Sequence, residues 1–193
     1  MQPIVPGATP PPHYVSFTAE INPSTAEGLI GLMGNLATQR VPEVHLMLST
    51  PGGVVMSGIT IYNALRAMPF KLITYNVGNV DSIGNAVFLA GEERYASTNA
   101  TFMFHGVSMT VPAQTTMDRR FLTERMDSLV ADERRIGAVF GERTNLTEAD
   151  VVQLFERQQT KDADAALAAG IIHEVRDVQL PAGAPVMGLV FQR

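Results

Sequence analysis

Apolar and polar residues alternate along the chain in blocks that have the periods of strands and helices. In the first half, continuous apolar runs predict strands over residues 14–21, 44–48 and 71–77. Apolar positions at helical spacing predict helices over residues 24–40 and 56–67. Ser24 with Glu27 matches a capping box at the start of the first helix, and the turn STPGG follows the second strand.

The second half continues the same alternation with shorter elements. Its predicted helices cover residues 82–90, 117–140, 147–157 and 162–170. Its predicted strands cover residues 94–96, 101–105 and 171–175. Thr147 with Asp150 matches a second capping box, and Asp162 is expected to cap the last helix. Strands alternating with helices predict an α/β fold with a largely parallel sheet.

The chain length and the proline distribution predict one folded domain with an arm. A length of 193 residues fits a single domain. Residues 1–13 contain five prolines and predict an extended arm, which leaves residues 14–193 as the domain. The apolar segment 181–193 has no evident partner in the chain. The long helix carries charges together with Leu122 and Met126, which favours a projecting helix that meets another subunit.

Composition excludes several function classes. The formal net charge is −5 and no basic stripe is present, which argues against nucleic-acid binding. The chain has no cysteine, so disulfides, thiolate metal sites and cysteine nucleophiles are excluded. No apolar run approaches the roughly 20 residues that span a bilayer, and the first residues lack the pattern of a secretory signal. A cytoplasmic protein without membrane contact is therefore expected.

The stretch VDSIGNA at residues 80–86 contains a serine with two readings. Ser82 at a predicted helix start is most simply a cap for backbone amides. The alternative is a nucleophile whose oxyanion the same amides stabilise. The match to the nucleophile motif G-x-S-x-G is partial, because Gly84 is present but Val80 takes the place of the first glycine.

Three other features have both a structural and a chemical reading. The paired glycines of STPGGVV at residues 49–55 form a turn, or leave an amide free for an oxyanion hole. His105 ends the apolar strand TFMFH, where it is a packed residue or a general base. Asp162 and Asp164 are helix caps, or the third member of a catalytic triad.

Three segments in order resemble the proteolytic subunit (ClpP) family of the Clp protease, within the crotonase-like superfamily. They are STPGGVVMSGITIYNALRAM at 49–68, VDSIGNAVFLAGEERYASTNATFMFHGV at 80–107 and LFERQQTKDADAALAAGIIHEV at 154–175. The resemblance runs from about Tyr14 to Val175. It implies a crotonase-like fold of repeated ββα-type units with a protruding long handle helix, the handle region covering about residues 114–157.

The resemblance also implies a function and a site. Ser82 is the implied nucleophile, His105 the general base, and the amides of Gly53 and Ile83 the oxyanion hole. The implied activity is that of a serine endopeptidase, which hydrolyses peptides or unfolded proteins without a metal or other cofactor. The implied assembly is a homo-oligomer of heptameric rings around a chamber. An ATPase unfoldase as a partner stays open, because the family region that helps to form the docking clefts for a ring ATPase is replaced here by the proline-rich arm.

Departures from the family pattern leave two alternatives open. Gln158 stands where the family has the triad aspartate, so Gln158 is a candidate third member that carries no charge. Asp81 stands where the family has alanine, and a carboxylate there disfavours an oxyanion unless it points away. The proline-rich arm replaces the family's first helix, and residues 105–116 replace a glycine-rich substrate strand. The alternatives are a catalytically weak or inactive structural homologue and another crotonase-like reaction such as thioester hydrolysis.

Overall fold

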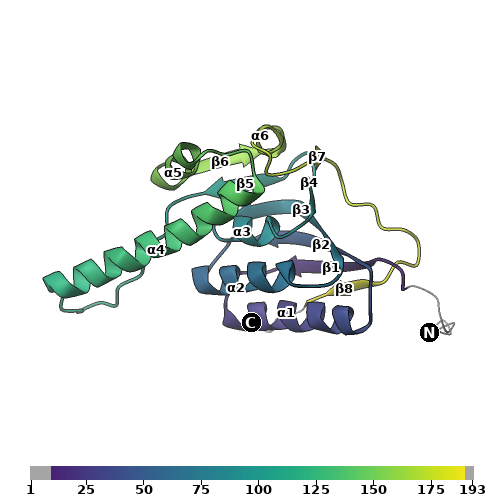
Figure 1. The fold of residues 1–193 in the computed structure, drawn as a ribbon, viewed down its shortest axis with the longest axis horizontal. Helices are drawn as coiled ribbons and strands as arrows, with labels where there is room; N and C mark the ends of the chain where they lie inside the picture. Colours follow the sequence, from purple (N-terminus) through teal and green to yellow (C-terminus); the bar gives the residue numbers. More distant parts are fainter. Residues whose placement is uncertain (1–9, 190–193) are drawn as a thin grey trace.

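The computed structural model describes residues 10–189, which form a sheet flanked by helices (Figure 1). The strands are β1 (His13–Thr18), β2 (Glu43–Thr50), β3 (Lys71–Asp81), β4 (Glu93–Ala96), β5 (Thr101–Phe104), β6 (Gln159–Asp162), β7 (Glu174–Val175) and β8 (Val186–Gly188). The helices are α1 (Pro23–Thr38), α2 (Val55–Arg66), α3 (Gly84–Phe88), α4 (Arg119–Arg143), α5 (Glu148–Glu156) and α6 (Ala163–Ala168). The predicted α/β class is confirmed.

The sheet is largely parallel, as the sequence predicts. Its order is β6-β5-β3-β2-β1-β8, with β4 pairing to β3 and to β7, and among the strands of the described residues only the β5–β6 pair is antiparallel. The long strand β3 pairs with β4 through Ile73 to Asn76 and with β5 through Asn79 to Asp81. The second half of β3 therefore ends directly beside β5, and the chain leaves both strands at the same edge of the sheet.

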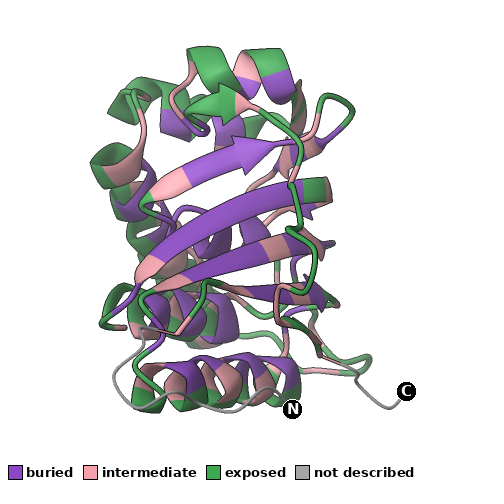
Figure 2. Ribbon diagram, turned by 90° about the vertical axis from the view of Figure 1, so that its right-hand side faces the viewer, coloured by how far each residue is buried: buried purple, intermediate pink, exposed green. Residues whose placement is uncertain are grey.

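The core explains the helical spacing seen in the sequence. Helix α1 buries Leu29, Met33 and Leu36, which recur at helical spacing on one face, and α2 buries Ile61 and Leu65. Figure 2 shows that the central strands consist mostly of buried residues. Burial on both faces is what a parallel sheet with crossover helices requires.

Helix starts confirm two predicted caps and correct a third. Thr147 and Asp150 form the predicted capping box of α5, and the Asp162 side chain accepts from the Ala165 amide at the start of α6. Helix α1 begins earlier than predicted, because Asn22 and Thr25 form its capping box. Proline at the first helical position has a backbone angle suited to a helix, so Pro23 favours this earlier start.

Two strands were missed by the sequence analysis. Strand β6 pairs with β5, inside a segment predicted to be loop and helix start. The apolar tail has a partner after all, since β8 pairs in parallel with β1 and the Tyr14 amide donates to the Pro185 carbonyl. Both are short strands with no clear alternation of polar and apolar residues. Within the predicted arm, residues 1–9 lie outside the described residues, and His13 begins β1.

Helix α4 projects from the body of the molecule, as the sequence predicts (Figure 1). Only Ile136, Val139 and Phe140, near its C-terminal end, are buried. Its outer part exposes the apolar side chains of Leu122, Met126 and Val130. None of the helices between residues 10 and 189 is long and apolar enough to cross a membrane.

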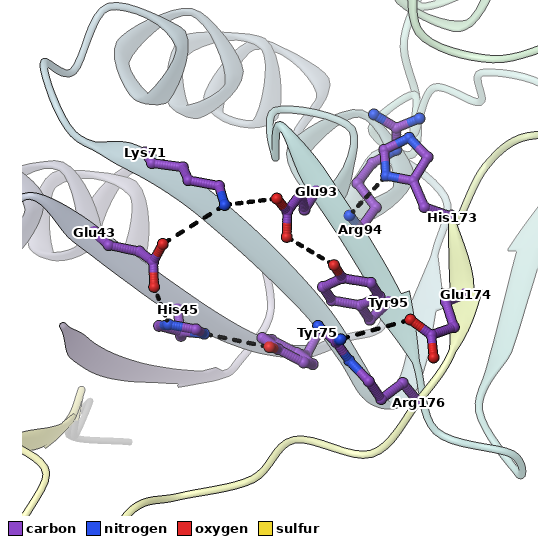
Figure 3. A network of polar contacts seen from close by, with 10 residues as sticks. All are labelled: Glu43, His45, Lys71, Tyr75, Glu93, Arg94, Tyr95, His173, Glu174 and Arg176. Carbon is purple, nitrogen blue, oxygen red and sulfur yellow. Dashed lines mark hydrogen bonds and ion pairs between the residues drawn. The ribbon is translucent and has the colours of Figure 1, made fainter.

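Polar side chains join β2, β3 and β4 on one face of the sheet (Figure 3). Lys71 forms ion pairs with Glu43 and Glu93, and its hydrogen bond lowers the pKa of the Glu93 carboxyl. The segment after β7 packs on this face, where the guanidinium of Arg176 lies 3.6 Å from the centre of the Tyr95 ring. This network stabilises the sheet at a distance from the candidate residues for chemistry.

Candidate active site

Ser82 lies in a sharp turn between β3 and α3. Its φ angle is +55°, a left-handed conformation that non-glycine residues adopt rarely and at a cost of about 1–3 kcal/mol. Its backbone N–H donates to the carbonyl of Met103 in β5 at 2.8 Å, which ties the turn to the neighbouring strand. A strained serine between a strand and a helix is the geometry of a nucleophile elbow.

The capping alternative for Ser82 is wrong. Helix α3 begins at Gly84, its N-cap is Ile83, and no side chain caps it. The Ser82 hydroxyl forms no hydrogen bond to any residue between 10 and 189. The Ser82 hydroxyl therefore does not serve as a helix cap.

His105 follows β5 directly. Its Nδ1 lies 2.7 Å from the carbonyl oxygen of Gly106, and a carbonyl can only accept a hydrogen bond. Nδ1 therefore carries the proton, and Nε2 of the neutral ring keeps a lone pair that can accept one. This is the tautomer that a general base for a serine requires.

Ser82 and His105 line the same cavity, of about 60 Å³, together with Gly53 and Ile83. The register of β3 and β5 pairs Asp81 with Met103, so both residues follow adjacent strands at one edge of the sheet. No hydrogen bond joins the Ser82 hydroxyl to His105 in this state. Catalytic hydrogen bonds are often long without substrate and tighten when it binds.

The remaining wall of the cavity is mostly apolar. It consists of Val55, Phe104, Gly106, Val107, Ser108, Ile136, Phe140 and Phe155. Ile136 and Phe140 come from the base of α4, so the projecting helix also forms part of the site. An apolar wall excludes water and strengthens electrostatic interactions in the cavity.

The glycine turn brings a free amide to this cavity. The amide of Ile21 donates to the Gly52 carbonyl and the Ile21 carbonyl accepts from Val54, which leaves Gly53 between these two bonds. The N–H groups of Gly53 and Ile83 have no hydrogen-bond partner within residues 10–189. At Gly53 a Cβ would lie 2.1 Å from the Ile21 carbonyl oxygen, so this position accepts only glycine.

Asp81 has a partner on the sheet. The Asn79 side-chain amide donates to its carboxylate at 2.6 Å, and the Ser49 hydroxyl donates to Asn79. Asp81 does not line the cavity of Ser82 and His105. The expected conflict between this carboxylate and an oxyanion is therefore relieved by its orientation toward Asn79.

Within residues 10–189, none of the three candidate third members forms a hydrogen bond with His105. Gln159 of β6 pairs with Phe104 of β5 in antiparallel register, so the preceding residue Gln158 lies near the following residue His105. Gln158 forms no hydrogen bond with any described residue. Asp162 caps α6 and Asp164 lies in the first turn of that helix. The position that a triad carboxylate would occupy is taken by the Gly106 carbonyl.

Two further residues beside the site were missed by the sequence analysis. Glu133 of α4 accepts a hydrogen bond from the Val107 amide at 3.3 Å, next to the carbonyl that holds His105. Asn85 of α3 donates to the carbonyls of Ser82 and Met103. Glu133 is one of many charges on a long helix, and no local pattern distinguished it. Asn85 had a visible signal, since an asparagine within an apolar run is unusual.

No group of three or more histidine, aspartate or glutamate side chains suited to a metal ion occurs in the described part of the chain. The chemistry available to these residues is that of a hydroxyl, an imidazole and two backbone amides. Such a set supports nucleophilic attack on a carbonyl carbon with stabilisation of the resulting oxyanion.

The class of protein follows from the fold and from the comparison with known proteins. A mixed α/β fold with a long projecting helix is consistent with the ClpP and crotonase type. The model of the Clp protease family matches residues 12–179, and the chain belongs to that family.

A particular relative is the "ATP-dependent Clp protease proteolytic subunit 2" of Pseudomonas aeruginosa. It is 25% identical over 173 residues, which cover 86% of this chain and 84% of the relative. The resemblance inferred from three segments of the sequence is confirmed, and the chain is a distant member of the family.

Proposed function

We propose that this protein is a serine endopeptidase of the Clp proteolytic subunit type. One observation carries the proposal: the Ser82 turn, His105 and the free amides of Gly53 and Ile83 line one cavity. These are the residues that the family resemblance assigns to nucleophile, base and oxyanion hole. The substrate class is a peptide or an unfolded protein.

The proposed reaction begins when the Ser82 hydroxyl attacks the carbonyl carbon of a peptide bond. Nε2 of His105 takes the hydroxyl proton and then gives it to the leaving amine. The amides of Gly53 and Ile83 donate to the tetrahedral oxyanion, each contributing about 3 kcal/mol of transition-state stabilisation. Water, deprotonated by the same histidine, then hydrolyses the acyl-enzyme.

The partner of His105 predicts a slow enzyme. The Gly106 carbonyl holds the correct tautomer but lacks the full charge that would stabilise the imidazolium. Replacing the triad aspartate by asparagine costs about 10⁴-fold in triad enzymes through the wrong tautomer, so the loss expected here, where the tautomer is held and only the charge is missing, is smaller. The same observation favours the second candidate, a catalytically weak or inactive structural homologue with Gln158 in place of the aspartate.

We also propose that the protein acts as a homo-oligomer built with α4. Leu122, Met126 and Val130 are exposed on this helix, and a groove of about 600 Å³ lies between α4 and α5. Family membership supports heptameric rings and an ATPase unfoldase as partner, since the relative is described as ATP-dependent. The cytoplasmic location expected from the sequence stays a prediction.

The experiment is covalent labelling with a fluorophosphonate probe, which reacts with activated serines. The wild-type protein should be labelled and Ser82→Ala should not. Ser108→Ala is the matched control, because Ser108 lines the same cavity and should be dispensable. Labelling that survives Ser82→Ala, or is absent from the wild type, would overturn the proposed nucleophile. Labelling without turnover of unfolded protein would favour the weak homologue.

A further inference from the structure

The side chain of Asn85 joins the turn that holds Ser82 to the strand that leads to His105. Its Nδ2 donates to the Ser82 carbonyl at 3.0 Å and to the Met103 carbonyl at 2.9 Å. The Met103 carbonyl also accepts from the Ser82 amide. One carbonyl of β5, two residues before His105, thus receives two hydrogen bonds from the segment of the nucleophile.

The other end of the same amide has no partner in the segment 10–189. Oδ1 of Asn85 is buried and accepts no hydrogen bond from these residues, and Asn85 is 1% exposed. A buried acceptor without a partner is unfavourable for folding, while an apolar side chain at this position would avoid that cost. The neighbouring positions in α3, Ala86, Val87 and Phe88, are apolar and fully buried. Packing alone therefore does not account for asparagine at position 85.

The bonds that Asn85 does form restrain a strained residue. Ser82 has the left-handed backbone already described, and its carbonyl accepts from both the amide and the side chain of Asn85. Strained conformations persist when surrounding interactions over-determine them, and they occur at functional sites. The second bond from Nδ2, to Met103, sets the spacing between this turn and β5.

We propose that Asn85 is a positioning residue for the reaction of Ser82. It holds the left-handed turn against β5, so that the hydroxyl and His105 face one cavity. The inference rests on the proposed function, and Asn85 acts only through Ser82 and Met103, because it does not line the cavity. The cost of this arrangement is a lower free energy of unfolding, because the buried Oδ1 of Asn85 accepts no hydrogen bond within the described residues.

The test compares Asn85→Leu and Asn85→Ala with the matched control Val87→Ala in the same helix. The fluorophosphonate labelling rate should fall at least about tenfold in both Asn85 variants. A fall of this size is expected when roughly one to two hydrogen bonds that hold the Ser82 turn against β5 are lost. The Tm of each variant is measured alongside, so that the labelling rate can be expressed per folded molecule. Val87→Ala should lower the Tm but leave the labelling rate per folded molecule unchanged.

Two results would overturn the inference. One is an unchanged labelling rate in Asn85→Leu and Asn85→Ala. The other is a rate that falls only in proportion to the folded fraction. A readout independent of activity keeps the test separate from the proposed function: hydrogen exchange of the Ser82 amide, measured by NMR. Exchange should be at least about tenfold faster in Asn85→Leu than in the wild type or Val87→Ala. Equal exchange rates would refute the positioning role even if the wild type proves unreactive toward the probe.

Discussion

Gly52 lies directly against Ser82. A Cβ placed on Gly52 would be 2.7 Å from the Ser82 Cβ and 2.7 Å from the Asp81 carbonyl oxygen. The turn after β2 and the turn after β3 are therefore in contact through a position that has no room for a side chain. The φ angle of Gly52, +86°, adds a second reason for glycine, because other residues are strained there.

Gly52→Ala is expected to displace the Ser82 turn and to lower the free energy of unfolding by about 1–3 kcal/mol. Urea denaturation measures the loss of stability, and fluorophosphonate labelling measures the effect on Ser82. Gly31→Ala is the control, since a Cβ at Gly31 in α1 meets nothing within 4 Å. That variant should be as stable as the wild type or more stable by up to about 1 kcal/mol. Equal behaviour of the two variants would contradict the close approach.

Glu133 is expected to hold the loop that places the partner of His105. Glu133→Ala removes the acceptor of the Val107 amide and should slow labelling and turnover about tenfold, as expected for one lost hydrogen bond. Glu133→Gln keeps an acceptor oxygen and should retain most of the activity. The ring ¹⁵N shifts of His105 report its tautomer and should change only in Glu133→Ala.

The control for Glu133 is Glu124→Ala on the same helix. Glu124 is exposed and, among the described residues, pairs only with Arg120, so its loss should be nearly neutral. If Glu133→Gln and Glu133→Ala are equally impaired, the carboxylate charge matters and the hydrogen bond to Val107 does not.

Most of the fold was predictable from the sequence because its periodicities come from burial. The apolar runs became β2 and β3, and the helical spacing of Leu29, Met33 and Leu36 became the buried face of α1. Strands β6 and β8 were not predictable, because each is short and is defined by its partner strand rather than by its own pattern. The start of α1 depended on a local competition between Asn22 and Ser24.

The candidate site was predictable only in part. Ser82 was singled out as a hydroxyl at a predicted helix start and His105 as a histidine at the end of an apolar strand. Their proposed roles, and those of Gly53 and Ile83, came from the family resemblance. The partner of His105 could not be predicted, because it is the backbone carbonyl of Gly106, and every residue type has such a carbonyl. Asp81 was expected to interfere, but its bond to Asn79 depends on a side-chain orientation that no sequence pattern reports.

Gln158→Asp is expected to raise turnover if the protein is a weakened member of the family. Position 158 lies next to the β5–β6 pair that ends beside His105, so a carboxylate there can replace the Gly106 carbonyl as partner of Nδ1. The gain in kcat should be at least about tenfold, within the roughly 10⁴-fold that a triad aspartate contributes. Steady-state cleavage of a fluorogenic peptide measures it, with Gln153→Asp in α5 as a charge-matched control. No gain would indicate that His105 works with the Gly106 carbonyl alone.

His173 should make stability depend on pH in a defined direction. Partial desolvation of its ring, with the nearby charges of Arg94 and Arg143, lowers the pKa of His173 below its ordinary value near 6.5. Its Nδ1 accepts the Arg94 backbone N–H at 3.2 Å, which requires the neutral ring (Figure 3). The unfolded chain thus binds a proton at a higher pH than the native protein does.

The contribution of His173 is therefore fully present above about pH 6.5 and is lost as the pH falls through the lower native pKa. His173→Asn keeps an acceptor for the Arg94 amide but does not titrate, so its Tm should fall less than that of the wild type between pH 7 and pH 5. His13→Asn is the control, because the ring of His13, half-buried at the start of β1, hydrogen-bonds to the nearby Pro11 carbonyl and lies in a different part of the sheet. Thermal unfolding at a series of pH values measures the difference. Parallel Tm profiles for wild type and His173→Asn would show that the Arg94–His173 contact does not couple folding to protonation.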